Sequence, residues 1–143
     1  AELLKVVNLI EGFDNLNLND HYNISPQKRG LLYWISGVDD GRSMLHHSTE
    51  EALEHFGKTG RAACVTTEVL AIYRENPEVL LYREDAGVPA EKNGHNIDVA
   101  GSRIGKLMPG LCFEEARRRV ELVASDPEGK GYNRWGAASR EAD

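Results

Sequence analysis

The sequence predicts an α+β fold, in which a small antiparallel sheet packs against about three helices. Three observations lead to this fold class. A hairpin pattern spans 31–46, a short apolar stretch bounded by turn residues at 78–83 is typical of a strand, and helical patterns recur near 49–56, 62–75 and 111–125. The 143 residues match the usual size of one domain and can bury a core. We therefore expect the whole chain to form a single globular domain.

The hairpin at 31–46 is predicted from its residue types. Branched and aromatic residues fill 31–35, and Asp40 and Gly41 form a pair that tolerates positive φ at both centres of a type I′ turn. A short apolar return follows through Met44. This hairpin and the strand at 78–83 would form the antiparallel sheet.

The helix at 49–56 has the clearest start signal. Ser48 is followed three residues later by Glu51, which is the spacing of a capping box. In that motif each side chain bonds the backbone N–H of the other residue. Gly57 would end the helix in a left-handed conformation. The buried face would comprise Ala52, Leu53 and Phe56.

The segment 62–75 fits a helix that ends before Pro77, because a residue preceding proline is disfavoured in the α region. Val69 and Ile72 would lie on its buried face. The β-branched run "CVTTEV" within it is also compatible with a strand. Both alternatives remain open from the sequence.

The segment 111–125 predicts a third helix. Its apolar residues recur at helical spacing, and its charges fall into two pairs four residues apart, Glu114 with Arg118 and Glu115 with Arg119. Such pairs are typical of a solvated helical face.

Two segments lack a sustained pattern. Residues 84–110 contain five glycines and two prolines, and a structureless loop of that length is unusual in a domain. This segment therefore either contains a short element around "NIDVA" or carries the function. The tail 127–143 is expected to be loosely ordered, although Tyr132 and Trp135 could pin it to the body.

Composition excludes several classes of protein. The net charge of −6, from 17 basic and 23 acidic residues, argues against nucleic acid or an anionic membrane as the main partner. Cys64 and Cys112 do not have the spacing of a disulfide framework, so we expect reduced thiols in a cytoplasmic protein. The chain shows neither a signal-peptide pattern nor the run of about 18 apolar residues that a membrane span needs.

His47, Glu51 and His55 would share one helical line, and could then hold a metal ion, if His47 were helical. The cap at Ser48 leaves His47 outside the helix, and the capping box already uses Glu51. We therefore expect no metal and no cofactor.

Cys64 is the candidate nucleophile. It follows a possible helix N-terminus, where a thiolate would be stabilised, and His46, His47 or His95 could act as its base. Small buried cysteines in a core are more common than catalytic ones. Whether the chain is an enzyme stays open.

Ser102, Arg103 and Lys106 form the candidate ligand site, together with His95 of the same glycine-rich segment. Glycines expose backbone N–H groups, and hydroxyl and cationic side chains beside them could hold a phosphate or a carboxylate. The competing interpretation is a solvated turn.

Three functional hypotheses follow. The leading one is a non-catalytic binding or accessory protein that engages a protein partner or a small, anionic ligand through 84–110, because no catalytic constellation meets its own spacing requirement. The second is a hydrolase or transferase that uses Cys64 with a histidine. The third is nucleic-acid binding through the tail residues Tyr132, Arg134 and Trp135, on which bases could stack.

Overall fold

The computed structural model describes residues 21–25, 33–83, 87–89, 92–116, 118–129 and 134–142. Within these ranges strands outnumber helices, so the prediction of about three helices on a small sheet is wrong. The elements are β1 (His21–Asn23), the 3-10 helix η3 (Arg42–Met44), α2 (Thr49–Thr59), β2 (Arg61–Ala63), α3 (Thr66–Glu75), the 3-10 helix η4 (Pro77–Leu80), β3 (Asn96–Asp98), β4 (Ser102–Ile104), β5 (Met108–Glu114), β6 (Arg119–Ser125), β7 (Trp135–Ala137) and β8 (Ser139–Glu141).

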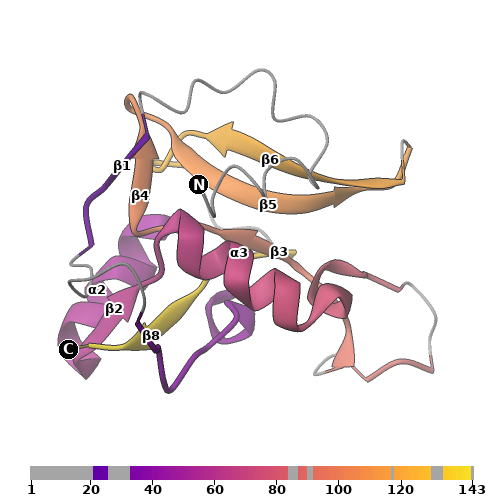
Figure 1. The fold of residues 1–143 in the computed structure, drawn as a ribbon, viewed down its shortest axis with the longest axis horizontal. Coiled ribbons are helices and arrows are strands. Elements are labelled where there is room, and N and C mark those ends of the chain that lie inside the picture. Colours follow the sequence, from indigo (N-terminus) through magenta and orange to yellow (C-terminus); the bar gives the residue numbers. More distant parts are fainter. Residues whose placement is uncertain are drawn as a thin grey trace.

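The described strands form three sheets (Figure 1). The largest has the order β6-β5-β3-β7, in which β5 runs antiparallel to both β6 and β3, and β7 runs parallel to β3. Two smaller antiparallel pairs, β1 with β4 and β2 with β8, lie beside it. The last of the described strands, β8, therefore pairs with β2, which lies far from it in the sequence.

The main core lies between α3 and one face of the four-stranded sheet. Ile97, Leu111 and Leu122 are fully or almost fully buried and pack against Val69 and Leu70 of α3. Ile97 is directly opposite Leu111, and Leu111 directly opposite Leu122, so these three residues share one face across three strands. Burial of each such side chain contributes roughly 1.5–3 kcal/mol.

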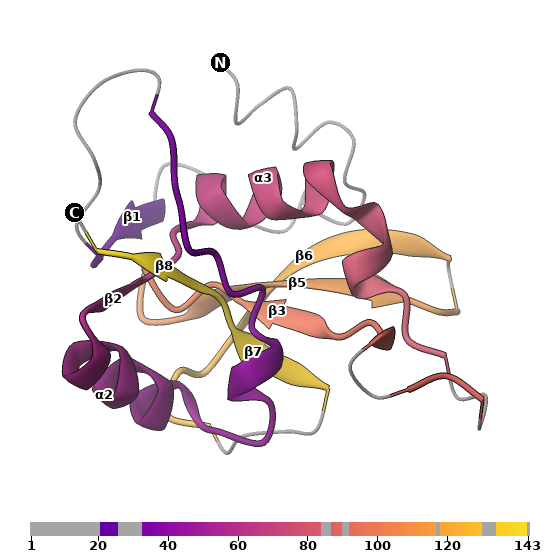
Figure 2. The same ribbon diagram turned by 90° about the horizontal axis from the view of Figure 1, so that it is seen from below.

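A second apolar cluster forms on the opposite face of the sheet. Met108 at the start of β5 and Ala137 of β7 pack against Ala52 and Phe56 of α2. Met108 and Leu111 are three residues apart on one strand, and therefore point to opposite faces. α2 and α3 accordingly lie on opposite sides of the sheet, as Figure 2 shows.

The predicted helix at 111–125 is instead the hairpin of β5 and β6. In its register Glu114 lies directly across from Arg119, so the hairpin brings opposite charges together as a helix would. Val120 and Leu122 face the core at strand spacing, and Arg118 has a positive φ of 51° in the turn. The charge pattern was therefore compatible with both structures, and tertiary packing selected the strands.

The predicted hairpin at 31–46 is also wrong in the part that the structure describes. Asp39 forms a bridge with Ser139 of β8, and residues 42–44 form a 3-10 helix where a return strand was expected. Gly41 has a positive φ of 99°, and a Cβ there would collide with the carbonyl oxygen of Gly136. The glycine is required by this close approach of two backbones and not by a type I′ turn.

The predicted strand at 78–83 is wrong as well, since η4 covers Pro77–Leu80 and the chain continues without a strand to residue 83. Pro77 occupies the first turn of η4, where its missing N–H costs no hydrogen bond. Val79 and Leu80 nevertheless enter the main core. The apolar run thus identified buried residues but not their backbone conformation.

Two helix predictions hold in part. The capping box of Ser48 and Glu51 is confirmed at the start of α2, but α2 continues through Gly57 to Thr59, and its C-cap is Gly60, which has a φ of 67°. In the segment 62–75, the helix α3 begins only at Thr66, because Arg61–Ala63 form β2.

Residues of the segment 127–143, for which loose order was expected, contribute β7 and β8. β7 completes the four-stranded sheet, and β8 pairs with β2. Ala138 and Arg140 are fully buried. This part of the chain is therefore structural, since its strands complete the four-stranded sheet and one of the two smaller sheets.

A buried ion pair joins β8 to the start of α3. The Nε of Arg140 donates to Oε2 of Glu68 at 2.6 Å, and both side chains are buried. Oε1 of Glu68 accepts from the backbone N–H of Val65 at 3.0 Å, and the hydroxyl of Tyr33 donates to Oε2 at 3.2 Å. The carboxylate thus receives three donors, which offsets much of its desolvation cost.

None of the described helices is long and apolar enough to cross a lipid bilayer.

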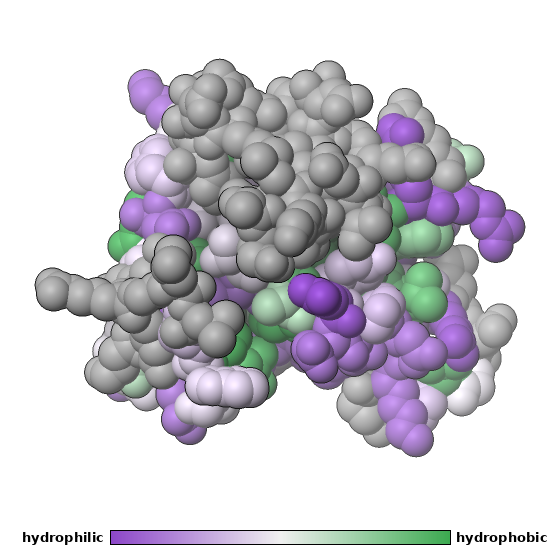
Figure 3. Space-filling view, in the orientation of Figure 1, coloured by the Kyte–Doolittle hydropathy of each residue, from purple (hydrophilic) through white to green (hydrophobic). Residues whose placement is uncertain are grey.

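On the face that carries α3, the described side chains are mostly hydrophilic, with smaller hydrophobic areas between them (Figure 3).

We predict that breaking the Glu68–Arg140 pair destabilises the fold strongly. E68M or R140M alone leaves a buried charge without its partner and should lower the free energy of unfolding by about 3–5 kcal/mol. The double variant E68M/R140M should lose less than the sum of the two single variants. Urea unfolding followed by circular dichroism measures all three.

The exposed pair of Lys58 and Glu54, four residues apart on α2 with 2.9 Å between Nζ and Oε1, supplies the control. E54Q should change the free energy of unfolding by at most about 0.5 kcal/mol. If E68M cost no more than E54Q, the buried pair would not stabilise the fold.

Candidate functional site

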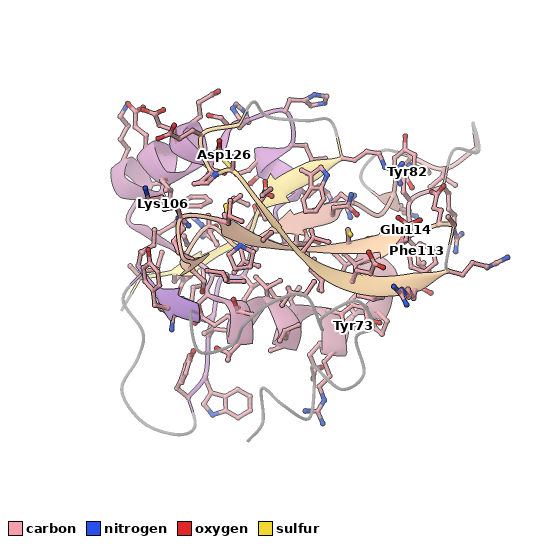
Figure 4. The ribbon with its side chains drawn as sticks, turned by 90° about the horizontal axis from the view of Figure 1, so that it is seen from above. Tyr73, Tyr82, Lys106, Phe113, Glu114 and Asp126 are labelled. Atoms are coloured by element: carbon pink, nitrogen blue, oxygen red, sulfur yellow. The ribbon has the colours of Figure 1, made fainter. Side chains whose placement is uncertain are left out.

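A cleft of about 260 Å³ opens between the start of α2 and the face of the large sheet opposite α3. Its walls come from the start of α2 and the two residues before it, from the strands β3, β5, β6 and β7, and from the turn after β6. Figure 4 shows Asp126 of that turn on the side of α2, across the sheet from Tyr73 of α3. The lining residues are His47, Ser48, Thr49, Asp98, Met108, Val123, Ser125, Asp126, Gly129 and Trp135.

The α2 wall is held in place by its cap. Oγ of Ser48 accepts from the backbone N–H of Glu51 at 3.1 Å, and Oε1 of Glu51 accepts from the backbone N–H of Ser48 at 3.4 Å. Oε2 of Glu51 lies 3.1 Å from Nδ1 of His47, and this contact lowers the pKa of Glu51. The glutamate therefore both caps the helix and orients the imidazole at the mouth of the cleft.

Asp98 ends β3 and lines the cleft from the sheet. Its side chain is partly buried, and burial raises the pKa of its carboxyl to about 6 from the usual 3.8. No described residue donates a hydrogen bond to this carboxyl or forms an ion pair with it. Asp98 therefore offers the cleft a carboxyl that receives no hydrogen bond from the described residues and whose pKa is raised to about 6.

Trp135 forms an aromatic wall of the cleft because Gly110 leaves room for it. A Cβ on Gly110 would lie 2.7 Å from Cζ3 of the indole, so the ring rests against the backbone of β5. Met108 and Val123 add apolar surface to the lining. Thr49 Oγ1 donates to Sδ of Met108 at 3.4 Å, which fixes the contact between α2 and β5.

Cys64, the candidate nucleophile, lies in the main core with no exposed surface. Burial, followed by the charge of Glu68, raises the pKa of its thiol to about 12. Among the described contacts no hydrogen bond joins Cys64 to a histidine. His46 and His47 are exposed on the segment before α2, so the structure does not assemble a thiolate–imidazole pair.

The predicted anion-binding set does not converge on one point. Ser102 is buried, and its Oγ donates to Oδ1 of Asn23 at 2.7 Å and accepts from the backbone N–H of Thr66 at 3.0 Å. Nη1 of Arg103 donates to two backbone carbonyls. Lys106 is exposed at the turn between β4 and β5 (Figure 4).

His95 lies apart from those three side chains. Its Nε2 is 2.8 Å from the backbone oxygen of Asp40, and the residue is 2% exposed. Its Nδ1 is buried without a hydrogen-bond partner among the described residues. The contact links β3 to the loop before η3.

The residues proposed for nucleic-acid binding take part in the fold. The guanidinium of Arg134 stacks on the ring of Tyr82 at 3.9 Å and lies 3.5 Å from Oε1 of Glu115, while Trp135 lines the cleft. Tyr132 lies outside the described residues. In the described part of the chain, no group of three or more His, Cys, Asp or Glu side chains could hold a metal ion.

Comparisons with protein-family models, with curated proteins and with solved structures found no match. Three cleft residues, His47, Ser48 and Trp135, were expected from the sequence to have other roles, and Asp98 was missed. The signal that could have found Asp98 is a lone carboxylate within the short apolar run "NIDVA", where a strand would bury it.

We predict that Asp98 makes stability fall as pH rises. The pKa of this carboxyl is higher in the folded than in the unfolded state, so its protonation stabilises the fold. This contribution is complete below about pH 3.8 and is lost as the pH rises through about 6. At about 1.4 kcal/mol per pKa unit, wild type should lose about 3 kcal/mol relative to D98N between about pH 4 and pH 7.5. Urea unfolding of both proteins across this range measures the difference, and a difference that does not change with pH would contradict the prediction.

We also predict that Cys64 is inert in the native protein. Iodoacetamide at about pH 8 should modify it only through unfolding, because the thiolate is scarcely populated and the sulfur is inaccessible. Cys112, whose thiol pKa is raised by burial to about 11, is partly exposed and should react first. Mass spectrometry after timed alkylation separates the two sites, with the denatured protein as the control. Fast modification of native Cys64 would restore the enzyme hypothesis.

Proposed function

We propose that this chain is a binding protein for a small molecule and that the cleft beside α2 is its site. One observation carries the proposal: Asp98 presents to the cleft a partly buried carboxyl that no described side chain or backbone group satisfies. A carboxyl that lies in a cleft and whose pKa is raised by burial is typical of functional sites.

The composition of the lining supports a ligand site. It combines apolar and aromatic surface from Met108, Val123 and Trp135 with a few polar groups, which is typical of small-molecule pockets. Asp98 and Met108 belong to the glycine-rich segment 84–110, for which a binding role was expected. The small volume favours a compact molecule over a protein segment.

Binding is favoured over catalysis by the contacts of the candidate catalytic groups. Cys64 is in the core, and His47, although oriented by Glu51, has no hydrogen bond to a hydroxyl of the described residues. A nucleophile and a base within hydrogen-bond reach are the usual mark of covalent catalysis. The proposal therefore assigns His47 to the rim of a binding site.

Fluorescence of Trp135 provides the test. Trp34 is 89% exposed, so W34F should fold normally and leave Trp135 as the single tryptophan reporter. A panel of anionic, neutral and cationic molecules of up to about ten non-hydrogen atoms is titrated against this protein. We expect at least one compound to change the fluorescence saturably and to raise the melting temperature.

S125F in the W34F background supplies a blocked site, because Ser125 lines the cleft and its side chain is exposed. Binding should be lost in this variant. A71F adds the same ring at an exposed position of α3, on the other side of the sheet, and should bind normally. Binding that survives S125F, or a panel without any saturable response, would overturn the proposal.

A further inference from the structure

The charges around the cleft are predominantly negative. Asp98 and Asp126 both line it, and the one basic side chain of the described lining, His47, is paired with the carboxylate of Glu51. A concave site with charges of one sign concentrates ions of the opposite sign. A cation is therefore attracted to this cleft, and an anion is repelled.

The N-terminal end of α2 does not reverse this preference. Free N–H groups and the helix dipole usually make such an end attractive to anions. Here Ser48 and Glu51 already satisfy each other's backbone N–H groups, and Glu50 adds a second carboxylate in the first turn. The protein's own acidic side chains thus occupy the anion-favouring position.

The polar groups of the lining include hydrogen-bond acceptors that a donor on the ligand could use. The carboxyl of Asp98 has no donor among the described residues, and the hydroxyl proton of Thr49 is directed to Met108, which leaves its oxygen lone pairs free. A ligand that brings several N–H groups would satisfy these acceptors, and an ammonium group carries three.

The indole of Trp135 determines the remainder of the ligand. It lies so close to β5 that a Cβ on Gly110 would be 2.7 Å from its Cζ3, and Met108 and Val123 extend the apolar surface of the lining. Aromatic rings attract cations and also pack against flat apolar groups.

We infer that the ligand is a small primary amine in its protonated form, with the ammonium group on Asp98 and a compact apolar or aromatic body against Trp135. This inference rests on the proposed function of the cleft. Asp98 would form a charge-assisted hydrogen bond with the amine, and Asp126 would add attraction at the rim.

Three probes of nearly the same shape test the charge requirement: phenethylamine, 2-phenylethanol and phenylacetate. Each is titrated into the W34F protein at about pH 7.5 in a phosphate buffer free of amines. Loss of one charge-assisted hydrogen bond should weaken binding at least about tenfold, so phenethylamine should bind at least tenfold more tightly than 2-phenylethanol. Phenylacetate should bind most weakly of the three.

Two carboxylate variants in the W34F background identify the partner of the amine. D98N keeps the shape of the side chain. It should lower the affinity for phenethylamine at least about tenfold and change the affinity for 2-phenylethanol by no more than about twofold. E75Q removes one negative charge from an exposed position of α3 outside the cleft and should change neither probe. Circular dichroism verifies that both variants are folded.

The outcomes separate the two proposals. If 2-phenylethanol or phenylacetate binds as tightly as phenethylamine, or if D98N weakens all three probes equally, the amine inference is wrong while the cleft remains a ligand site. If no probe and no member of the wider panel binds, both proposals fail. Selective loss of phenethylamine binding in D98N supports both.

Discussion

The buried ion pair of Glu68 and Arg140 is the interaction on which the remaining architecture depends. A charged pair without exposure is tolerated only if its geometry is held closely, because separation would leave two unpaired charges in the core. The pair therefore fixes β8 against the start of α3. Since only Ala138 separates β7 from β8, the same constraint also positions β7 beside β3 and Trp135 over the cleft.

Local signals in the sequence were reliable where local contacts decide the structure. The cap of Ser48 and Glu51 involves atoms three residues apart, and it was predicted correctly together with the start of α2. Residues 111–125 were misassigned because charges at helical spacing also meet across a hairpin, with Glu114 opposite Arg119. The role of Gly41 could not be predicted, because it depends on Gly136, which lies far along the chain.

The candidate site was only partly accessible to sequence analysis for the same reason. Its lining combines the start of α2 with the strands β3, β5, β6 and β7, which no short motif unites. Asp98 is unremarkable as a residue type, and its chemistry arises from burial by neighbours that are distant in sequence. Cys64 illustrates the reverse case, since the residue type indicated reactivity and the core position raises its thiol pKa.

The pairing of β8 with residues near the opposite end of the described chain has a consequence for folding kinetics. Asp39 bridges Ser139, and the backbone N–H of Glu141 donates to the carbonyl of Ser36, so these contacts close loops of about 100 residues. Such contacts are slow to form because chain entropy is lost before they stabilise the structure. During folding α2 can form early from local contacts, whereas the cleft is complete only when β7 has paired with β3 and placed Trp135 in its wall. The cleft therefore forms later in folding than the helix that borders it.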